Sequence, residues 1–103
     1  MTRAKLKELE ELLLGIDVLV LEVENAKEKT PLTSHESIKI ANDFAALKQS
    51  ALRWIRHYIN ANTSEVEKHL LQEIAAGLKN LDSVNTQYAP AIMAALIRKL
   101  RRF

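Results

Sequence analysis

Cysteine is absent from this 103-residue chain, and glycine and proline are scarce, with two of each. Without cysteine, neither a disulfide nor a thiolate-ligated zinc site can form, which fits a reducing cytoplasm. With so little glycine and proline, the chain has few residues for the tight turns of a hairpin-rich fold, and an all-β architecture is excluded. Gly15 and Gly77 lie too far apart to form a glycine-rich phosphate-binding loop.

Long apolar runs are absent as well. The longest, residues 12–21, is interrupted by Gly15 and Asp17, whereas a membrane-spanning helix needs about 20 consecutive apolar residues. Residues 1–5 lead straight into charged sequence and lack the apolar block of a secretory signal. We therefore expect a cytoplasmic protein in which the apolar run belongs to a core.

Hydrophobic residues make up 48% of the sequence and charged residues 27%, a balance typical of a folded soluble domain. A chain of this length holds one hydrophobic core, so we expect a single domain over residues 1–103. The net charge of +2 is too small to indicate nucleic-acid binding on its own.

Two long stretches carry apolar residues at alternating three- and four-residue spacing, which places them along one side of a helix. The first stretch contains Leu6, Leu9, Leu13, Ile16, Val20 and Val23. The second contains Ile40, Phe44, Leu47, Ala51, Trp54 and Tyr58. This spacing predicts two long helices, over about residues 2–29 and 34–60.

Short polar segments separate the predicted helices. Pro31 cannot continue a helix and so ends the first one. Thr33 followed by Glu36, and Ser64 followed by Glu67, are each typical of an N-terminal capping box. Helix starts are therefore predicted directly after each of these two hydroxyl residues.

Two shorter helices are predicted over about residues 65–82 and 90–102. Pro90 suits the first turn of the last helix, where its missing N–H costs no hydrogen bond. The expected buried residues of the third helix are Val66, Leu70, Ile74, Leu78 and Leu81. Those of the fourth are Ile92, Met93, Leu96, Ile97 and Leu100. The sequence thus predicts an all-α, antiparallel up-down bundle of four helices, two long and two shorter.

The sign of the net charge alternates along the chain. Residues 1–30 and 63–83 each carry −2, whereas residues 31–62 carry +2 and residues 84–103 carry +4. Helices that follow one another lie side by side in an up-down bundle, so this alternation predicts weak attraction between adjacent helices.

Both long helices carry further apolar residues beside the main row. In the first helix, which we expect to be buried on more than one side, they are Leu12, Leu14, Val18, Leu19 and Leu21. Asp17 lies among them, either in a narrow solvated strip or as a buried carboxylate that needs a basic partner. In the second helix they are Ala41, Ala45, Leu52, Ile55 and Ile59. This row exceeds what a monomer of this size is expected to cover, so a homodimer is one hypothesis.

A partly cationic strip is predicted on the second helix, beside the aromatic residues Trp54 and Tyr58. Its members, at three- and four-residue spacing, are Arg53, Arg56, His57 and Asn60. Such a strip could hold a phosphate or a carboxylate of a partner protein. The alternative is a solvated helix face, with both aromatic side chains in the core.

The predicted fourth helix ends in a basic segment. Its residues are Arg98, Lys99, Leu100, Arg101, Arg102 and Phe103. The helix dipole favours cations at a C-terminus, but four of them at five successive positions exceed what a cap requires. The segment is a candidate contact for an acidic protein, with nucleic-acid phosphates or an anionic membrane surface as less favoured partners.

One histidine raises the question of a metal site. His69 has Glu65 and Glu73 four residues away on either side. A solvated helix face explains the same spacing, and we expect no metal and no other cofactor. The pattern contains no nucleophile–base pair and no carboxylate dyad with a supporting group, so we expect no enzymatic activity.

These features favour a small non-catalytic, cytoplasmic protein that binds and regulates another protein. Inhibitors, adaptors, secretion chaperones and toxin- or bacteriocin-immunity proteins share this size and architecture. In length, helix number and basic charge alone, the chain is similar to the immunity proteins of pediocin-like bacteriocins. The expected partner-binding residues are Arg53, Arg56, His57, Arg98, Lys99, Arg101, Arg102 and Phe103. The alternative is a nucleic-acid-binding protein that uses the basic C-terminal helix.

Overall fold

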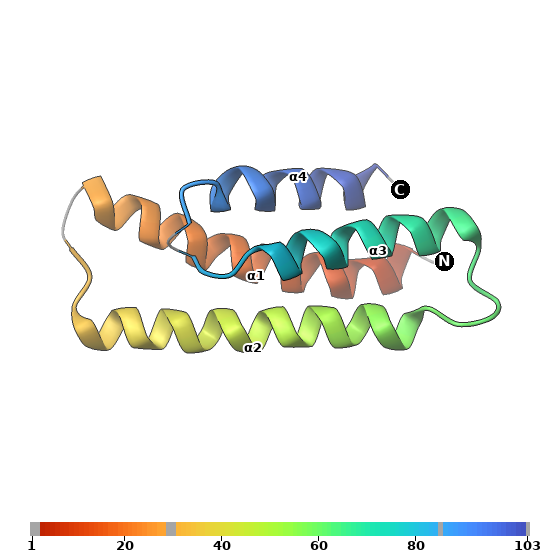
Figure 1. The fold of residues 1–103 in the computed structure, drawn as a ribbon, viewed down its shortest axis with the longest axis horizontal. Coiled ribbons are helices and arrows are strands. Elements are labelled where there is room, and N and C mark those ends of the chain that lie inside the picture. Colours follow the sequence, from red (N-terminus) through yellow and green to blue (C-terminus); the bar gives the residue numbers. More distant parts are fainter. Residues whose placement is uncertain (1–2, 29–30, 85, 103) are drawn as a thin grey trace.

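A computed structural model describes residues 3–28, 31–84 and 86–102, and these residues form four α-helices with no strand (Figure 1). The helices are α1 (Arg3–Glu28), α2 (Ser34–Tyr58), α3 (Glu65–Asn80) and α4 (Ala89–Arg101). The predicted all-α fold is confirmed. The largest difference in helix bounds is at the ends of α2 and α3, which each stop two residues before the predicted position.

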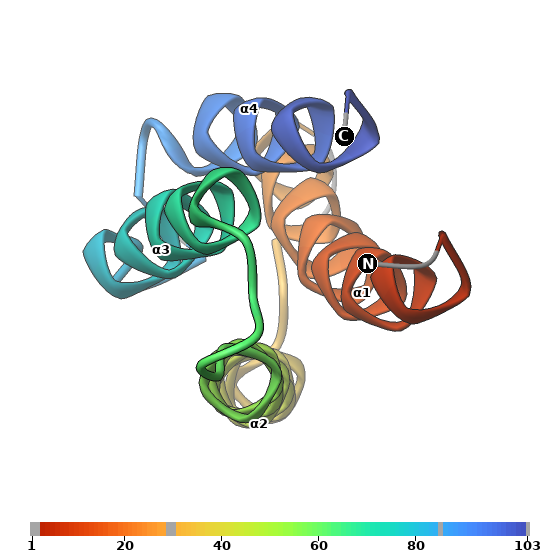
Figure 2. The ribbon, with the colours of Figure 1, turned by 90° about the vertical axis from the view of Figure 1, so that its right-hand side faces the viewer.

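The four helices form an antiparallel bundle in which each helix packs against two neighbours (Figures 1 and 2). Seen along the bundle, α1 lies between α2 and α4, and α3 closes the ring on the other side. The described part of the chain measures 48 × 23 × 21 Å. This ring gives every helix one side toward the core and one side toward solvent.

The predicted core row of α1 is confirmed, because Leu6, Leu9, Leu13, Ile16, Val20 and Val23 are all buried. Burial of α1 on further sides is confirmed only in part. Leu19 is buried, but Val18 and Leu21 remain 54% and 47% exposed. The reason is that α1 has two helical neighbours, which leave its third side open to solvent.

The core face of α3 differs from the prediction at its start. Val66 is 70% exposed, and Leu71, which the prediction left out, is fully buried. The buried residues of this segment are Leu71, Ile74, Leu78 and Leu81. Repeated four-residue steps drift by about 40° each around an α-helix. The predicted row, which began with three such steps from Val66, therefore started on the wrong side.

The helix starts have the predicted chemistry. The Thr33 hydroxyl accepts a hydrogen bond from the Glu36 backbone N–H, and the Glu36 carboxylate accepts one from the Thr33 backbone N–H, each at 3.1 Å. The first capping box is therefore confirmed. At α3, the Ser64 hydroxyl accepts from the Glu67 backbone N–H at 3.2 Å, so the N-cap is confirmed there as well.

Unequal helix lengths shape one end of the molecule. The helices α1 and α2 have 26 and 25 residues, whereas α3 and α4 have 16 and 13. The connection between α3 and α4 consequently lies partway along the bundle, and the α1–α2 hairpin projects beyond it (Figure 1). On this projection Ile38 is 61% exposed.

Candidate functional site

The two charged segments expected to bind a partner lie at the same end of the bundle. The C-terminal ends of α2 and α4 meet the N-terminal half of α1 there (Figure 1). The first half of α1 therefore separates the cationic strip of α2 from the basic end of α4. Its carboxylates contact both sides, since Glu8 bonds to α2 and Glu10 to α4.

Trp54 and Tyr58 form an aromatic pair at the edge of the bundle. Their rings stack with centroids 5.0 Å apart and planes 10° from parallel. The indole nitrogen of Trp54 donates a hydrogen bond to a carboxylate oxygen of Glu8 at 3.0 Å. Both aromatic side chains are half-buried and pack against the buried core, so the interpretation that they belong to the core is confirmed only in part. The two helices that pack against α2, α1 and α3, leave part of each aromatic side chain exposed.

A hollow of about 470 Å³ lies beside this pair. We call its lining the Trp54 surface, which consists of Lys5, Glu8, Ser50, Arg53, Trp54, His57 and Tyr58. A second hollow of about 360 Å³ shares three of these residues and continues onto the polar α2–α3 connection. The pKa of Tyr58, which lines both hollows, is raised by partial burial and further by the Glu67 charge.

The predicted strip divides between this hollow and open solvent. Arg53 and His57 line the Trp54 surface, and both are exposed. Arg56 is exposed but lines neither hollow, and Asn60 lines only the second one. Glu8 was not among the predicted site residues, because nothing in the local pattern of α1 relates it to a tryptophan 46 positions later.

The basic end of α4 makes contacts within the bundle. The Lys99 ammonium lies 3.5 Å from a Glu73 carboxylate oxygen on α3, and the Arg101 Nε lies 3.1 Å from one on Glu10 of α1. Two of the four cations of this segment, Lys99 and Arg101, therefore form ion pairs with the adjacent helices. Arg98 and Arg102 are exposed and form no ion pair with a described residue. Phe103 lies outside the described residues.

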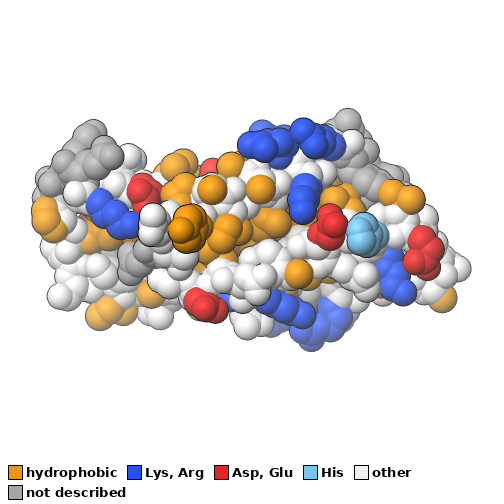
Figure 3. Space-filling view, turned by 45° about the horizontal axis from the view of Figure 1, so that its top comes forward, with side chains coloured by type: hydrophobic (Ala, Val, Ile, Leu, Met, Phe, Trp, Pro, Cys, Tyr) orange, Lys and Arg blue, Asp and Glu red, His pale blue; other side chains and the backbone are white. Residues whose placement is uncertain are grey.

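A third hollow, of about 410 Å³, follows the seam between α1 and α4. It is lined by Leu14, Asp17, Ala94, Ile97, Arg98, Arg101 and Arg102. Figure 3 faces the side formed by α3 and α4, with α1 behind them, and it shows Lys and Arg side chains along the upper edge of that side. Asp17 is half-buried here, and partial burial raises its pKa. No ion pair joins it to a described arginine, so it is neither fully solvated nor a buried, paired carboxylate.

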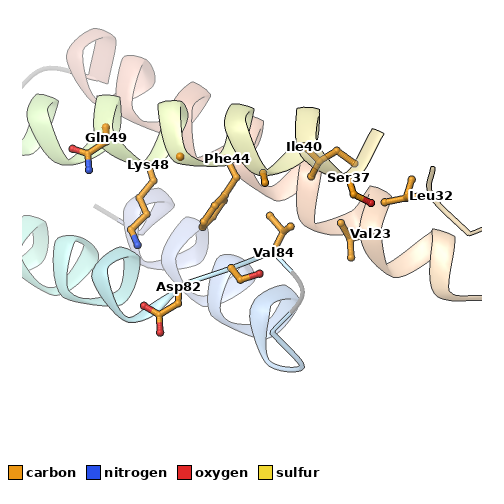
Figure 4. A pocket seen from close by; sticks show the side chains of 12 residues that line it. Val23, Leu32, Ser37, Ile40, Phe44, Lys48, Gln49, Asp82 and Val84 are labelled. Atoms are coloured by element: carbon orange, nitrogen blue, oxygen red, sulfur yellow. The ribbon is translucent and has the colours of Figure 1, made fainter. Parts of the chain in front are cut away.

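An apolar groove of about 280 Å³ opens where the hairpin projects beyond α3 and α4 (Figure 4). Phe44 and Ile40 form its floor, and Val84 of the α3–α4 connection lies opposite. The Lys48 ammonium crosses the rim, donates a hydrogen bond to the Leu81 carbonyl at 3.0 Å, and lies 5.8 Å from the Phe44 ring centre. This lysine fixes the connection against α2.

The second apolar row of α2, which suggested a homodimer, is partly covered within one chain. Ile55 is buried, and Leu52 and Ile59 are half-buried. Ala41 and Ala45 remain exposed at the side of the groove. The monomer therefore covers the part of the row that faces α3. That a homodimer covers the exposed part of the row stays a hypothesis.

His69 contacts one of its two glutamates, with Nε2 3.1 Å from a Glu73 carboxylate oxygen. Glu73 also forms an ion pair with Lys99, so its two carboxylate oxygens lie beside a histidine and a lysine. Within the described ranges, no three histidine or carboxylate side chains are grouped closely enough to hold a metal ion.

The described helices are each too short or too polar to cross a membrane. The residues that the structure brings together form three hollows around the first half of α1, one aromatic, one polar and one basic. Comparison with known proteins finds no family model, no curated protein and no solved structure that matches this chain.

Proposed function

We propose that this chain is a non-catalytic, regulatory protein-binding module that engages its partner through the Trp54 surface. The observation that carries the proposal is the stacked Trp54–Tyr58 pair, half-exposed in a hollow and flanked by Arg53. Tryptophan, tyrosine and arginine are the residue types that most often dominate the binding energy of protein interfaces. Their presence in one hollow supports a docking site.

The aromatic pair is already held in place before a partner binds. Stacking fixes the two rings against each other, and the hydrogen bond to Glu8 fixes the indole against α1. A side chain that is ordered in the free protein loses little conformational entropy on binding, and this saves about 0.5–1.5 kcal/mol per side chain. The Trp54 surface therefore has the rigidity of an anchor.

The charges around the pair favour an acidic partner. Arg53 supplies a permanent positive charge beside the pair, and Lys5 and the His57 imidazole line the same hollow, which contains the single carboxylate of Glu8. Complementary charge speeds association and selects partners. A toxin- or bacteriocin-immunity protein or a secretion chaperone would act in this way, because each works by holding another protein.

Nucleic-acid binding through the basic end of α4 has less support. Lys99 and Arg101 already pair with carboxylates of the bundle. A helix-turn-helix crosses its two helices at about 90–120°, whereas α3 and α4 lie side by side and run in opposite directions (Figure 1).

Affinity capture from the lysate of the source cells tests the proposal. Wild type, Arg53→Glu, Trp54→Ala and a Lys39→Glu control are immobilised in parallel, and bound proteins are identified by mass spectrometry. We expect one partner on wild type and on the control, whose exposed lysine lies outside the three hollows. Hot-spot losses of about 2 kcal/mol or more would weaken binding about thirtyfold in the other two variants.

The same four proteins also show which results would contradict the proposed function. Equal capture by all four proteins would exclude the Trp54 surface as the docking site. Affinity for duplex DNA that falls steeply with added salt would favour the nucleic-acid alternative. Circular dichroism melting of each variant shows whether a lost partner reflects a lost surface or a lost fold.

A further inference from the structure

We propose that the furrow between α1 and α4 is a second docking site, separate from the Trp54 surface, and that it takes an amphipathic helix of a partner protein with acidic side chains at one end. The furrow combines an apolar stretch with an arginine cluster. These features lie on the opposite flank of α1 from Glu8 and Trp54.

The register of the two helices sets the layout of the furrow. The ion pair between Glu10 and Arg101 places the start of α1 beside the end of α4. Because the helices run in opposite directions, Leu14 and Asp17 of α1 then lie opposite Ala94 and its neighbours on α4, as their shared hollow shows. The furrow therefore has a basic end near Arg101 and an apolar end farther along α1.

The apolar end begins at Leu14, which is half-buried and lines the hollow, and we extend it beyond the hollow to the exposed Val18 and Leu21 of α1. Leu14, Val18 and Leu21 follow at four- and three-residue spacing and so share one side of the helix. Val18 is 54% exposed and Leu21 is 47% exposed. On the facing helix Ala94 adds a small side chain that keeps the furrow open. Adjoining exposed apolar side chains with a charged border are typical of interaction sites.

The basic end sets the charge of the occupant. Arg98 and Arg102 border the hollow and have no carboxylate partner among the described residues. Arginine binds carboxylates with two parallel hydrogen bonds, which makes acidic side chains good partners. An occupant that matches both ends is an amphipathic helix with an apolar face and acidic residues near one terminus, the arrangement of helix-in-groove recognition.

The positions of Asp17 and Glu10 favour a partner helix over a membrane surface as the occupant of the furrow. Both carboxylates lie along the same seam as the arginines. A uniformly anionic lipid surface would be repelled by them, whereas a helix can place its acidic side chains only where the arginines are. α4 has 13 residues, or about 20 Å, which sets the length of the expected occupant at about four turns.

Fluorescence anisotropy with a defined peptide tests this site. The probe is a labelled helical peptide of about 15 residues, with a leucine–alanine face and three glutamates in one terminal turn. The proteins are wild type, Arg98→Glu with Arg102→Glu, Val18→Ser with Leu21→Ser, and a control with Lys39→Glu and Lys79→Glu. The control makes the same change in net charge as the arginine variant, at exposed lysines outside the furrow.

We expect wild type and the control to bind the peptide, and each furrow variant to bind about tenfold more weakly or worse. A matched peptide with lysines in place of the glutamates should not bind. Trp54→Ala should leave the affinity unchanged, which separates this site from the proposed function. All substituted furrow residues are solvent-exposed, and a thermal melt of each variant verifies that it is folded.

Three outcomes would overturn the inference. The first is no binding of the acidic peptide to wild type at millimolar concentration. The second is equal binding of the acidic and basic peptides, which would mean that the arginines do not select the occupant. The third is preferential sedimentation of wild type with phosphatidylserine vesicles, lost in the arginine variant, which would assign the furrow to a membrane surface.

Discussion

The indole nitrogen of Trp54 and the carboxylate of Glu8 are joined by a hydrogen bond of 3.0 Å, although 46 positions separate them in the chain. This bond holds the aromatic pair of α2 against the first half of α1. It therefore connects the packing of the bundle to the surface that we propose binds a partner.

Removing the acceptor should release the ring. For Glu8→Ala we expect a loss of about 0.5–1 kcal/mol, since the bond is exposed to water. We also expect a changed emission wavelength and increased mobility of the indole. Trp54 is the single tryptophan of the chain, so tryptophan fluorescence reports on the surroundings of this one ring. Glu11→Ala, an exposed change on the same helix, should alter neither quantity. An unchanged spectrum in Glu8→Ala would contradict the role given to this bond.

The capping box at Thr33 should contribute measurably to stability. Thr33→Ala removes the hydroxyl that accepts from the Glu36 N–H, and we expect a loss of about 1 kcal/mol. That corresponds to about 4–8 °C in Tm for a domain of this size. Ser34→Ala changes a neighbouring exposed hydroxyl that is not the cap, and should shift Tm far less. Equal shifts in both variants would show that the cap has no special role.

The two glycines should respond oppositely to alanine. Alanine is favoured over glycine by about 1 kcal/mol inside a helix. At Gly15 the new Cβ would lie 3.2 Å from a terminal carbon of Leu47, which is half-buried and can move aside. We expect Gly15→Ala to raise Tm.

At Gly77 the same change meets the core. Three side-chain carbons of Leu96 would lie 2.7, 3.2 and 3.4 Å from the new Cβ, and Leu96 is only 4% exposed. Overpacking costs about 1–3 kcal/mol, which outweighs the helix gain, so we expect a lower Tm. Differential scanning calorimetry of both variants is the measurement. A rise in Tm for Gly77→Ala would mean that Leu96 repacks freely.

Asp17 should destabilise the bundle at neutral pH. Partial burial raises its folded-state pKa above the ordinary 3.8, so the native state binds its proton more tightly than the unfolded state does. The resulting stability is fully present below the unfolded-state pKa and is lost as pH rises through the folded-state pKa. The charged groups facing Asp17 are Arg98, Arg101 and Arg102.

Asp17→Asn removes the ionisable group and should raise Tm at pH 7. The gain should shrink as pH falls through the folded-state pKa and vanish below the ordinary value of 3.8, where Asp17 is protonated in both the folded and the unfolded state. Glu22→Gln, an exposed change on α1, should show no such trend. A lower Tm for Asp17→Asn at pH 7 would indicate that attraction to the arginines outweighs desolvation.

Much of the fold follows from local pattern. The row from Leu6 to Val23 forms the core face of α1 because its spacing stays close to the helix period. The start of α2 follows from Thr33 and Glu36, whose side chains bond to backbone groups three residues away. Val66 shows where pattern fails, because a valine at the start of a helix carries no information about where the core lies.

The candidate sites depended on contacts that local pattern does not contain. Segment charges predicted attraction between helices. Only the packing shows that Lys99 and Arg101 form ion pairs, whereas Arg98 and Arg102 form none with the described residues. The position of Trp54 at the edge of the bundle depends on how far α1 and α3 wrap around α2. Neither fact can be derived from the residues around these positions.

The projection of the α1–α2 hairpin beyond α3 and α4 divides the molecule into a thick half and a thin half. Each residue of the thin half has neighbours from two helices, so opening it breaks fewer contacts than opening the four-helix half. The described part of this hairpin that projects beyond α3 and α4 should therefore exchange its amide hydrogens first, while the Trp54 surface and the furrow stay ordered. Both proposed docking sites consequently lie on the four-helix half, which opens least easily, and the half that opens most easily is at the other end of the molecule.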